Sequence, residues 1–200
     1  RVWPCLTGVV MAHPLLTHML IRSSIPKLAA PGPSAADLDV ILQAGFLAPD
    51  HQYLRPTRVH VINGDDRSAL GEVFVRAALS EEPELTPDSL ERLRLKPLRA
   101  PLILAVGCHT VAHPKVPEIE QVASTSAAVA LMQTAADALG YASMWRTGPM
   151  AYHPLVKRTF DLSAGDHLIA FLYLGTANTS SKRRPTKDFR QWVQRFPKPL

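Results

Sequence analysis

The pattern of hydrophobic positions is organised around one long segment that carries almost no charge. From Val122 to Ala136 no residue is charged, and Ala, Val, Ser and Thr dominate. A helix over Glu118–Leu139 would therefore be apolar or small on nearly every side, which is typical of a helix in a core or at an interface. At about 1.5 Å per residue it would run roughly 33 Å, enough to cross a domain. A plain core helix followed by a core strand is the simpler alternative.

Small residues recur on neighbouring turns of this helix and would let a second backbone approach closely. They are Ala123, Ala127, Thr134 and Ala138. Gly140 is expected to end the helix as a C-cap residue would. Tyr141–Thr147 then reads as a short strand that ends in Trp-Arg-Thr-Gly.

The remaining elements indicate a small sheet covered by helices. Ala100–Cys108 and His167–Leu174 are continuous apolar runs, as expected of buried strands, and Arg58–Asn63 alternates polar and apolar residues. Helices are predicted over Pro14–Ile21, Ala35–Phe46 with Ser34 as N-cap, Asp65–Leu79, Pro87–Leu95 and Pro154–Phe160. This order of elements favours an α+β sandwich with a small mixed sheet.

Composition is that of one globular domain. The 200 residues are 46% hydrophobic and 20% charged, and 22 Lys plus Arg against 17 Asp plus Glu give a net charge of +5. That charge favours phosphorylated small molecules. Only Ser181–Arg184 forms a tight basic cluster, so a nucleic-acid partner is not expected, although a basic nucleic-acid-binding module remains an alternative.

Cysteine and histidine spacing predicts neither a disulfide framework nor a metal site. Cys5 and Cys108 lie far apart without a CxxC partner, which fits reduced thiols in a cytoplasmic protein. The histidines of His109–Pro117 lack partners at metal-ligand spacing. Arg1–Ile21 is an apolar stretch, but proline and polar residues interrupt it. No other stretch approaches the ~20 apolar residues that a membrane span requires. We expect Met11 to be the natural start, with residues 1–10 as an extension and residues 11–200 as one domain.

Two polar segments are candidates for chemistry. Arg22-Ser23-Ser24 follows the first predicted helix and could present a guanidinium and hydroxyls to a phosphate, or could simply be a solvated helix end. Ala48–Pro56 (APDHQYLRP) is a loop rich in groups that form hydrogen bonds. The chain contains no GxGxxG, P-loop, GxSxG or HExxH motif, which excludes the commonest nucleotide and hydrolase sites.

Several segments in order resemble the nitroreductase family of flavoproteins, and in particular its minimal bacterial NAD(P)H nitroreductases, over roughly Leu15–Thr176. The similar segments are Arg22-Ser23-Ser24, Ala44–Pro56, Arg99–Leu104, Lys115–Gln121, Gly140–Gly148 and Phe171–Thr176. The resemblance implies an α+β homodimer with a long interface helix and FMN between the subunits. It also implies that the C-terminal tail, with Phe189, Trp192 and Phe196, packs on the partner subunit.

The resemblance assigns cofactor-binding roles to seven residues and implies no catalytic side chain. Arg22, Ser23 and Ser24 would bind the FMN phosphate and ribityl chain, His51 would reach the flavin of the partner subunit, and Trp145, Arg146 and Thr147 would line the isoalloxazine. Ala135–Gly140 aligns with a stretch assigned to nicotinamide binding, but here it has the pattern of a buried helix end. For Arg146, the alternative is an ion pair with Glu120 or Asp137.

Three positions depart from the family pattern. Ser23 replaces a second basic residue, Pro26 stands where Lys, Arg or Ser is common, and Thr57 replaces an aromatic residue. Lys182, Arg183 or Arg184 could restore the missing charge at the phosphate.

The implied reaction passes a hydride from NADH or NADPH through flavin N5 to a nitroaromatic or quinone-like acceptor. Enone reduction, reductive dehalogenation, flavin fragmentation and non-catalytic flavin binding are the alternatives on this scaffold.

Overall fold

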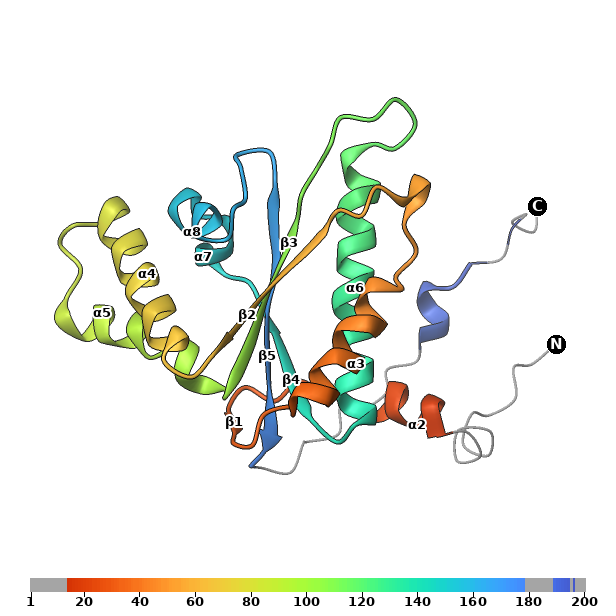
Figure 1. Ribbon diagram of the computed structural model, residues 1–200, viewed down its shortest axis with the longest axis horizontal. Coiled ribbons are helices and arrows are strands. Elements are labelled where there is room, and N and C mark those ends of the chain that lie inside the picture. The colour runs from red at the N-terminus through yellow and green to blue at the C-terminus, as the bar shows by residue number, and fades with distance from the viewer. Residues whose placement is uncertain (1–13, 179–188, 195, 197–200) are drawn as a thin grey trace.

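The computed structural model describes residues 14–178, 189–194 and 196. At its centre lies a five-stranded sheet (Figure 1). The strand order is β1-β5-β3-β2, and β4 also pairs with β5. The strands are β1 (Leu28–Ala29), β2 (Thr57–Asn63), β3 (Leu102–Cys108), β4 (Ala142–Arg146) and β5 (His167–Ala177). All four strand pairs are antiparallel. The sheet ladders are thus antiparallel rather than mixed, and the α+β architecture is as predicted.

Strand β3 is buried along its whole length because helices cover both faces of the sheet. Ile103 and Ala105 belong to the core on one face, whereas Leu104 and Val106 belong to the core on the other. A strand covered on both sides shows no alternation of polar and apolar residues. This explains the continuous apolar run in the sequence.

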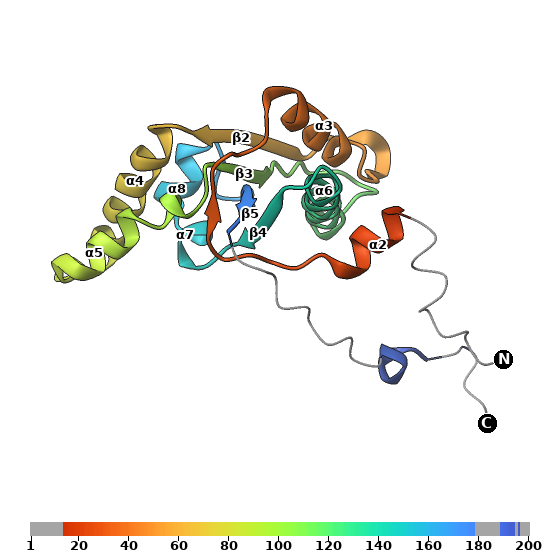
Figure 2. The same ribbon diagram turned by 90° about the horizontal axis from the view of Figure 1, so that it is seen from below.

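One face of the sheet is covered by α3 (Ala35–Phe46) and α6 (Glu118–Ala138), which lie side by side (Figure 2). Met132 and Val129 of α6 are fully buried beside Ile41 of α3. A Cβ atom added to Gly45 would collide with the side chain of Met132, so the two helices pack at the closest distance that glycine allows.

The opposite face is covered by a second group of helices. They are α4 (Asp66–Glu81), α5 (Pro87–Arg94), α7 (Pro149–Tyr152) and α8 (Pro154–Thr159). The chain also forms the 3-10 turns η1 (His51–Tyr53), η2 (Pro97–Arg99) and η3 (Phe189–Trp192). Phe74, Phe160 and Phe171 form the aromatic centre of this core. The ring centroid of Phe171 lies 5.3 Å from that of Phe74 and 6.0 Å from that of Phe160.

The helix ends follow the capping residues of the sequence. The Asp37 amide donates to Ser34 Oγ at 3.1 Å, as expected of an N-cap serine. After α6, Gly140 takes a positive φ of 86° and Tyr141 N donates to Ala136 O at 2.8 Å, which closes the helix as predicted.

Some features were not predicted. The strand β1, the helix α7 and the extension of β5 from Leu174 to Ala177 are absent from the sequence-based series. The expected helix over Pro14–Ile21 is present as α2. Residues 1–10 and the basic Lys182–Arg184 lie outside the described residues. Within the described ranges, no helix is long and apolar enough to cross a membrane, and no cluster of three or more potential ligands could hold a metal ion.

Candidate functional site

The segment with Arg22, Ser23 and Ser24 lies along the free edge of β4. Ser24 forms an isolated parallel bridge with Ser143, and Ile25 N donates to Ser143 O at 3.1 Å. The Ser143 hydroxyl is held in turn by Gln133 Nε2 of α6 at 3.0 Å. Two stretches that are about 120 residues apart in sequence therefore lie side by side.

One nitrogen of the Arg22 guanidinium lacks an acceptor in the described part of the chain. Its Nη1 atom is buried and has no hydrogen-bond partner among the described residues. The Arg22 amide continues α2 by donating to His18 O at 3.0 Å. A buried N–H group without an acceptor costs free energy, and a phosphate oxygen would satisfy it. This orphaned donor fits the phosphate group expected at this position.

Trp145 and Arg146 leave β4 on opposite faces of the sheet, because side chains alternate along a strand. Trp145 is partly buried against the core on the α6 side and donates from Nε1 to Ile169 O at 3.0 Å. Arg146 lies on the side of α4 and α7, with its guanidinium carbon 5.3 Å from the ring centroid of Tyr173. Of these two side chains, only that of Trp145 lies on the same face of the sheet as α6.

Arg146 is only partly satisfied. Its Nη2 donates to Pro26 O at 2.7 Å, whereas its Nε is buried without a partner among the described residues. Burial lowers the pKa of this guanidinium, because the charged form loses hydration. The contact with Pro26 ties the Arg22–Ser24 segment to the end of β4.

The alternative ion pair of Arg146 with Glu120 or Asp137 is not formed. Glu120 Oε2 lies 2.7 Å from His51 Nδ1, and Asp137 Oδ2 lies 2.9 Å from His18 Nδ1. Both carboxylates are thus used by histidines at opposite ends of α6.

Thr147 stands where two cavities meet. It is exposed at the end of β4 and, together with Trp145, lines one cavity of about 290 Å³ and another of about 340 Å³. Gly148, which follows, has a φ of 74° that favours glycine. The strand therefore ends in a sharp turn beside open space, where a planar ligand could approach the backbone.

His51 lies far from these residues within one chain. Its partner Glu120 is in the first turn of α6, whereas His18, four residues before Arg22, contacts Asp137 in the last turn. The 17 residues from Glu120 to Asp137 span about 26 Å of helix. A single chain therefore does not bring His51 together with Arg22, Ser23 and Ser24.

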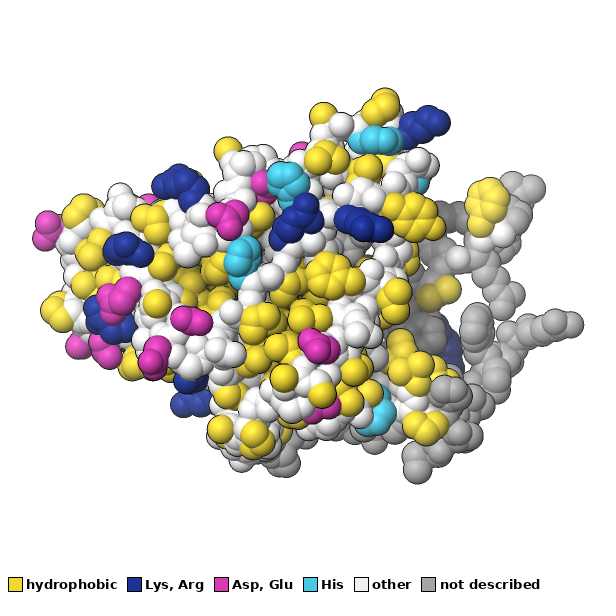
Figure 3. All heavy atoms as spheres, viewed as in Figure 1, with side chains coloured by type: hydrophobic (Ala, Val, Ile, Leu, Met, Phe, Trp, Pro, Cys, Tyr) yellow, Lys and Arg dark blue, Asp and Glu magenta, His cyan; other side chains and the backbone are white. Residues whose placement is uncertain are grey.

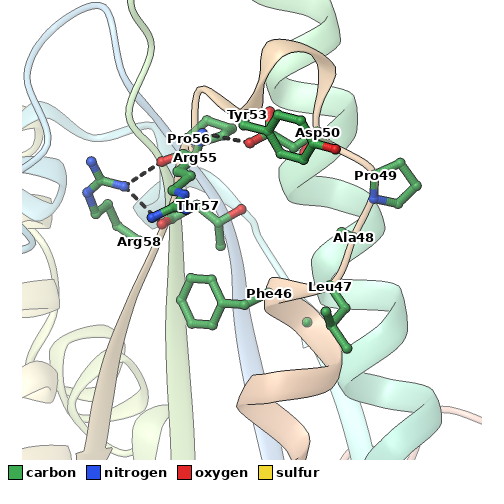
Figure 4. Close-up of a pocket in the computed structure, with 12 residues that line it drawn as sticks. Phe46, Leu47, Ala48, Pro49, Asp50, Tyr53, Arg55, Pro56, Thr57 and Arg58 are labelled. Carbon is green, nitrogen blue, oxygen red and sulfur yellow. Dashed lines mark hydrogen bonds between the residues drawn. The ribbon is translucent and has the colours of Figure 1, made fainter.

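The loop that carries His51 has an unusual backbone. Gln52, Tyr53 and Arg55 all have positive φ values, of 63°, 54° and 50°. Such conformations are costly for residues other than glycine and cluster at functional sites. Figure 4 shows Arg55 N donating to the Asp50 carboxylate, at 2.6 Å, which holds the turn.

A wide cavity of about 830 Å³ lies beside this loop, between α3 and β2. Phe46, Leu47 and Tyr53 at its rim are 57%, 81% and 84% exposed. Figure 3 shows hydrophobic side chains gathered over the middle of this face. So much exposed apolar surface in one area is typical of a binding face.

Two cationic side chains near the site were not singled out in the sequence. Lys96 and Arg99 line the 290 Å³ cavity together with Arg146. They come from the turn η2, about 50 residues before Arg146, so sequence spacing gave no signal of their proximity.

Comparison with known proteins identifies the family. The chain matches the sequence description of the Nitroreductase family over residues 21–176. The chain belongs to the nitroreductase family. This is a family of oxidoreductases, and the fold and the recognised motifs agree with it.

Relatives of the nitroreductase chain support this assignment. It is 36% identical over 161 residues to an Escherichia coli K12 protein named "Putative NAD(P)H nitroreductase YdjA", covering 80% of this chain and 87% of that one. A nitroreductase-like protein from Bacillus cereus has a TM-score of 0.78 at 17% identity, covering 98% of both chains. A structure from Desulfovibrio desulfuricans, described as a nitroreductase in complex with FMN, has a TM-score of 0.70 at 23% identity and covers 94% of this chain and 99% of that one.

Proposed function

We propose that this nitroreductase-family chain is an FMN-dependent oxidoreductase that takes a hydride from NADH or NADPH and reduces a nitroaromatic or quinone-like acceptor. The name of the Escherichia coli relative supports the nicotinamide, and the FMN in the Desulfovibrio desulfuricans neighbour supports the flavin. When bound, FMN would supply the redox chemistry itself, and the protein would bind and orient the reactants.

The observation that carries the proposal is the orphaned donor of Arg22 beside the edge of β4. We assign Arg22, Ser23 and Ser24 to the phosphate and ribityl chain. Trp145, Arg146 and Thr147 would line the ring and its polar edge. The positive charge of Arg146 would stabilise the negative charge that a reduced flavin carries.

The site would be completed by a second copy of the chain. His51 lies about a helix length away from Arg22 in one chain, so we assign to each flavin His51 of the partner subunit. The small-residue face of α6, where Ala123 and Ala138 are exposed and Ala127 and Thr134 are half-buried, supports a homodimer interface, as do the exposed apolar residues of α2. The apolar residues of α2 are Leu15, Leu16, Met19 and Leu20.

Anaerobic absorbance spectroscopy tests this function. The protein reconstituted with FMN should be yellow, should bleach when NADH or NADPH is added, and should recover its colour when a nitroaromatic compound or a quinone follows. A protein that does not retain FMN would contradict the proposal. A protein that binds FMN but is not bleached would indicate a non-catalytic flavin-binding module instead.

A further inference from the structure

A cavity of about 440 Å³ lies beside β2, the edge strand of the sheet. Its wall consists of the start of β2, of His109 directly after β3, and of residues 160–162 in the turn after α8. The volume lies within the range of about 300–1,000 Å³ that small-molecule sites occupy. None of the residues assigned to the flavin is among its described lining residues.

The sheet separates this cavity from the flavin residues on β4. The strands β5 and β3 lie between β4 and β2, so the two sites are at opposite edges. Thr57 contacts α6 through its hydroxyl, and the alternation along β2 therefore places Arg58 and His60 on the other face. There the His60 ring packs against Phe160 of the α8 turn, with ring centroids 5.3 Å apart. Figure 3 shows histidine and basic side chains close together over this end of β2.

One edge of the Arg58 guanidinium is occupied, and the other is open. Its Nη1 atom donates to Arg55 O at 2.7 Å and to Thr57 O at 3.0 Å, which holds the group in place (Figure 4). Its Nε and Nη2 atoms have no partner among the described residues. In Arg94 these same two atoms bind the carboxylate of Glu72. The open edge of Arg58 can therefore take two oxygens of one anion.

Two histidines supply further polar groups. His109 Nδ1 lies 3.2 Å from the carboxylate of Asp166. Burial alone would raise the pKa of Asp166, but its hydrogen bonds hold this pKa well below the usual range, so the carboxylate is ionised and only the imidazole can donate. This leaves His109 Nε2 without a partner among the described residues. His60 Nε2 lies 3.7 Å from Asp161, too far for a hydrogen bond.

The acidic groups near the cavity leave Arg58 unpaired. Asp166 is 2% exposed and lies behind His109, whereas Asp161 is 94% exposed and stands at the rim beside His60. Among the described lining residues, Arg58 alone carries a permanent positive charge, and no carboxylate lies within ion-pair distance of it. An anion that enters the cavity would thus be bound first by Arg58.

We infer that this cavity binds a phosphate monoester of a small organic molecule, with two phosphate oxygens on the open edge of Arg58 and the third facing His109. A phosphate monoester has three terminal oxygens and a charge of about −1.5 to −2 at pH 7, which suits a paired donor edge with a third polar group beside it. The organic part would lie against the rings of His60 and Phe160. The inference adds a ligand site to the one proposed for FMN and does not depend on the redox activity.

Isothermal titration calorimetry of the FMN-loaded protein with phenyl phosphate tests the inference, and phenol serves as the analogue without a phosphate. Phenyl phosphate should bind saturably and about tenfold or more tightly than phenol, as charge-assisted hydrogen bonds imply. Arg58→Gln should lower the phenyl phosphate affinity by a similar factor. Arg58→Lys, which keeps the charge without the paired donors, should lower it less. Arg92→Gln removes the same charge from an exposed position on α5 and should have little effect.

Asp161→Asn gives a test of opposite sign and does not touch the contacts that hold Arg58. It removes the exposed negative charge at the rim, so the phenyl phosphate affinity should rise, by roughly threefold or more. An unchanged or lower affinity would contradict the placement of the phosphate in this cavity.

Three further outcomes would overturn the inference. No saturable binding of phenyl phosphate, or equal binding of phenol, would show that the cavity is not an anion site. Equal losses in Arg58→Gln and Arg92→Gln would show that only the net charge matters. Binding that occurs in the FMN-free protein and disappears when FMN is added would place the phosphate in the flavin site instead. Circular dichroism of each variant establishes that its fold is retained.

Discussion

Arg146 stacks over Tyr173, with its guanidinium carbon 5.3 Å from the ring centroid, and at the same time donates from Nη2 to Pro26 O. One side chain thus joins the core of the sheet to the segment proposed to bind the FMN phosphate. Burial raises the pKa of Tyr173 to about 12, so its ring stays neutral and its face remains available to the cation at physiological pH.

Arg146→Gln should retain the fold and lower the midpoint potential of the bound flavin. Loss of the positive charge removes stabilisation from the reduced form, and each tenfold change in relative affinity corresponds to about 30 mV for a two-electron couple. A redox titration of the FMN-reconstituted variant beside the parent measures this shift. Arg146→Lys, which keeps the charge, should shift the potential less. An unchanged potential with full flavin occupancy in Arg146→Gln would make Arg146 a structural residue.

Arg22→Ala should weaken FMN binding by about 1.5–3 kcal/mol, the range for a hydrogen bond to a charged group. This corresponds to an increase of roughly 10- to 150-fold in Kd. Fluorescence titration of FMN into the cofactor-free protein measures it. The exposed Arg158 on α8 provides the control, and Arg158→Ala should bind FMN as the parent does. Equal flavin affinity in Arg22→Ala and the parent would remove Arg22 from the site.

Ala127→Glu should separate the proposed dimer, because a carboxylate would be buried in the small-residue face of α6. Light scattering should give a mass near twice 21.9 kDa for the parent and near 21.9 kDa for the variant. Ala69→Glu places the same charge at an exposed position of α4 and should leave the mass unchanged. A parent protein with the mass of one chain at micromolar concentration would refute the dimer.

Combining two variants that each lack one proposed flavin contact tests whether one site contains residues of two chains. Arg22→Ala and His51→Ala should each reduce FMN occupancy. Co-expressed with different affinity tags, they should form mixed dimers in which one of two sites has both residues intact. Occupancy near half of the parental value is expected in these mixed dimers. Occupancy no higher than in either variant alone would place Arg22 and His51 in separate functions.

Asp166→Asn should destabilise the fold at neutral pH. Burial alone would raise the pKa of Asp166, but hydrogen bonds from Ser163, from the Thr110 amide and from His109 outweigh it and hold this pKa well below its usual range. The substitution should cost about 1–3 kcal/mol in the free energy of unfolding at pH 7. Because the folded pKa is depressed, the difference should shrink only as the pH falls below the unfolded value of about 3.9.

Urea unfolding at several pH values measures this effect. Asp161→Asn is a suitable control, since the Asp161 side chain is 94% exposed. Equal stability of Asp166→Asn and the parent at pH 7 would contradict the assignment of Asp166 as a structural anchor.

The sequence alone predicts those helices, strands and caps whose signal lies within one stretch of the chain. The uncharged helix α6, the apolar strand β3 and the Ser34 cap were predicted because burial on two faces and capping each leave a mark within one stretch. The two-residue strand β1 leaves no such mark, since its pairing with β5 depends on the partner alone.

In the candidate site too, some features have a local signal in the sequence and others depend on the tertiary structure. The residues near the edge of β4 could be named from motifs, whereas the contacts of Arg146 with Pro26 and Tyr173 could not, because they depend on how the strands are paired. The ion pair that was the alternative for Arg146 is not formed, because histidines already use Glu120 and Asp137. Lys96 and Arg99 became visible only when the sheet brought η2 under the end of β4.

The separation of His51 from Arg22 by nearly the full length of α6 has a thermodynamic consequence. If each flavin contacts both chains, subunit association and flavin binding are linked equilibria, and each must strengthen the other by the same factor. Dilution should then release FMN, and excess FMN should hold subunits together at concentrations where the flavin-free chains separate. The flavin would act as a reversible cross-link between the two copies of the chain.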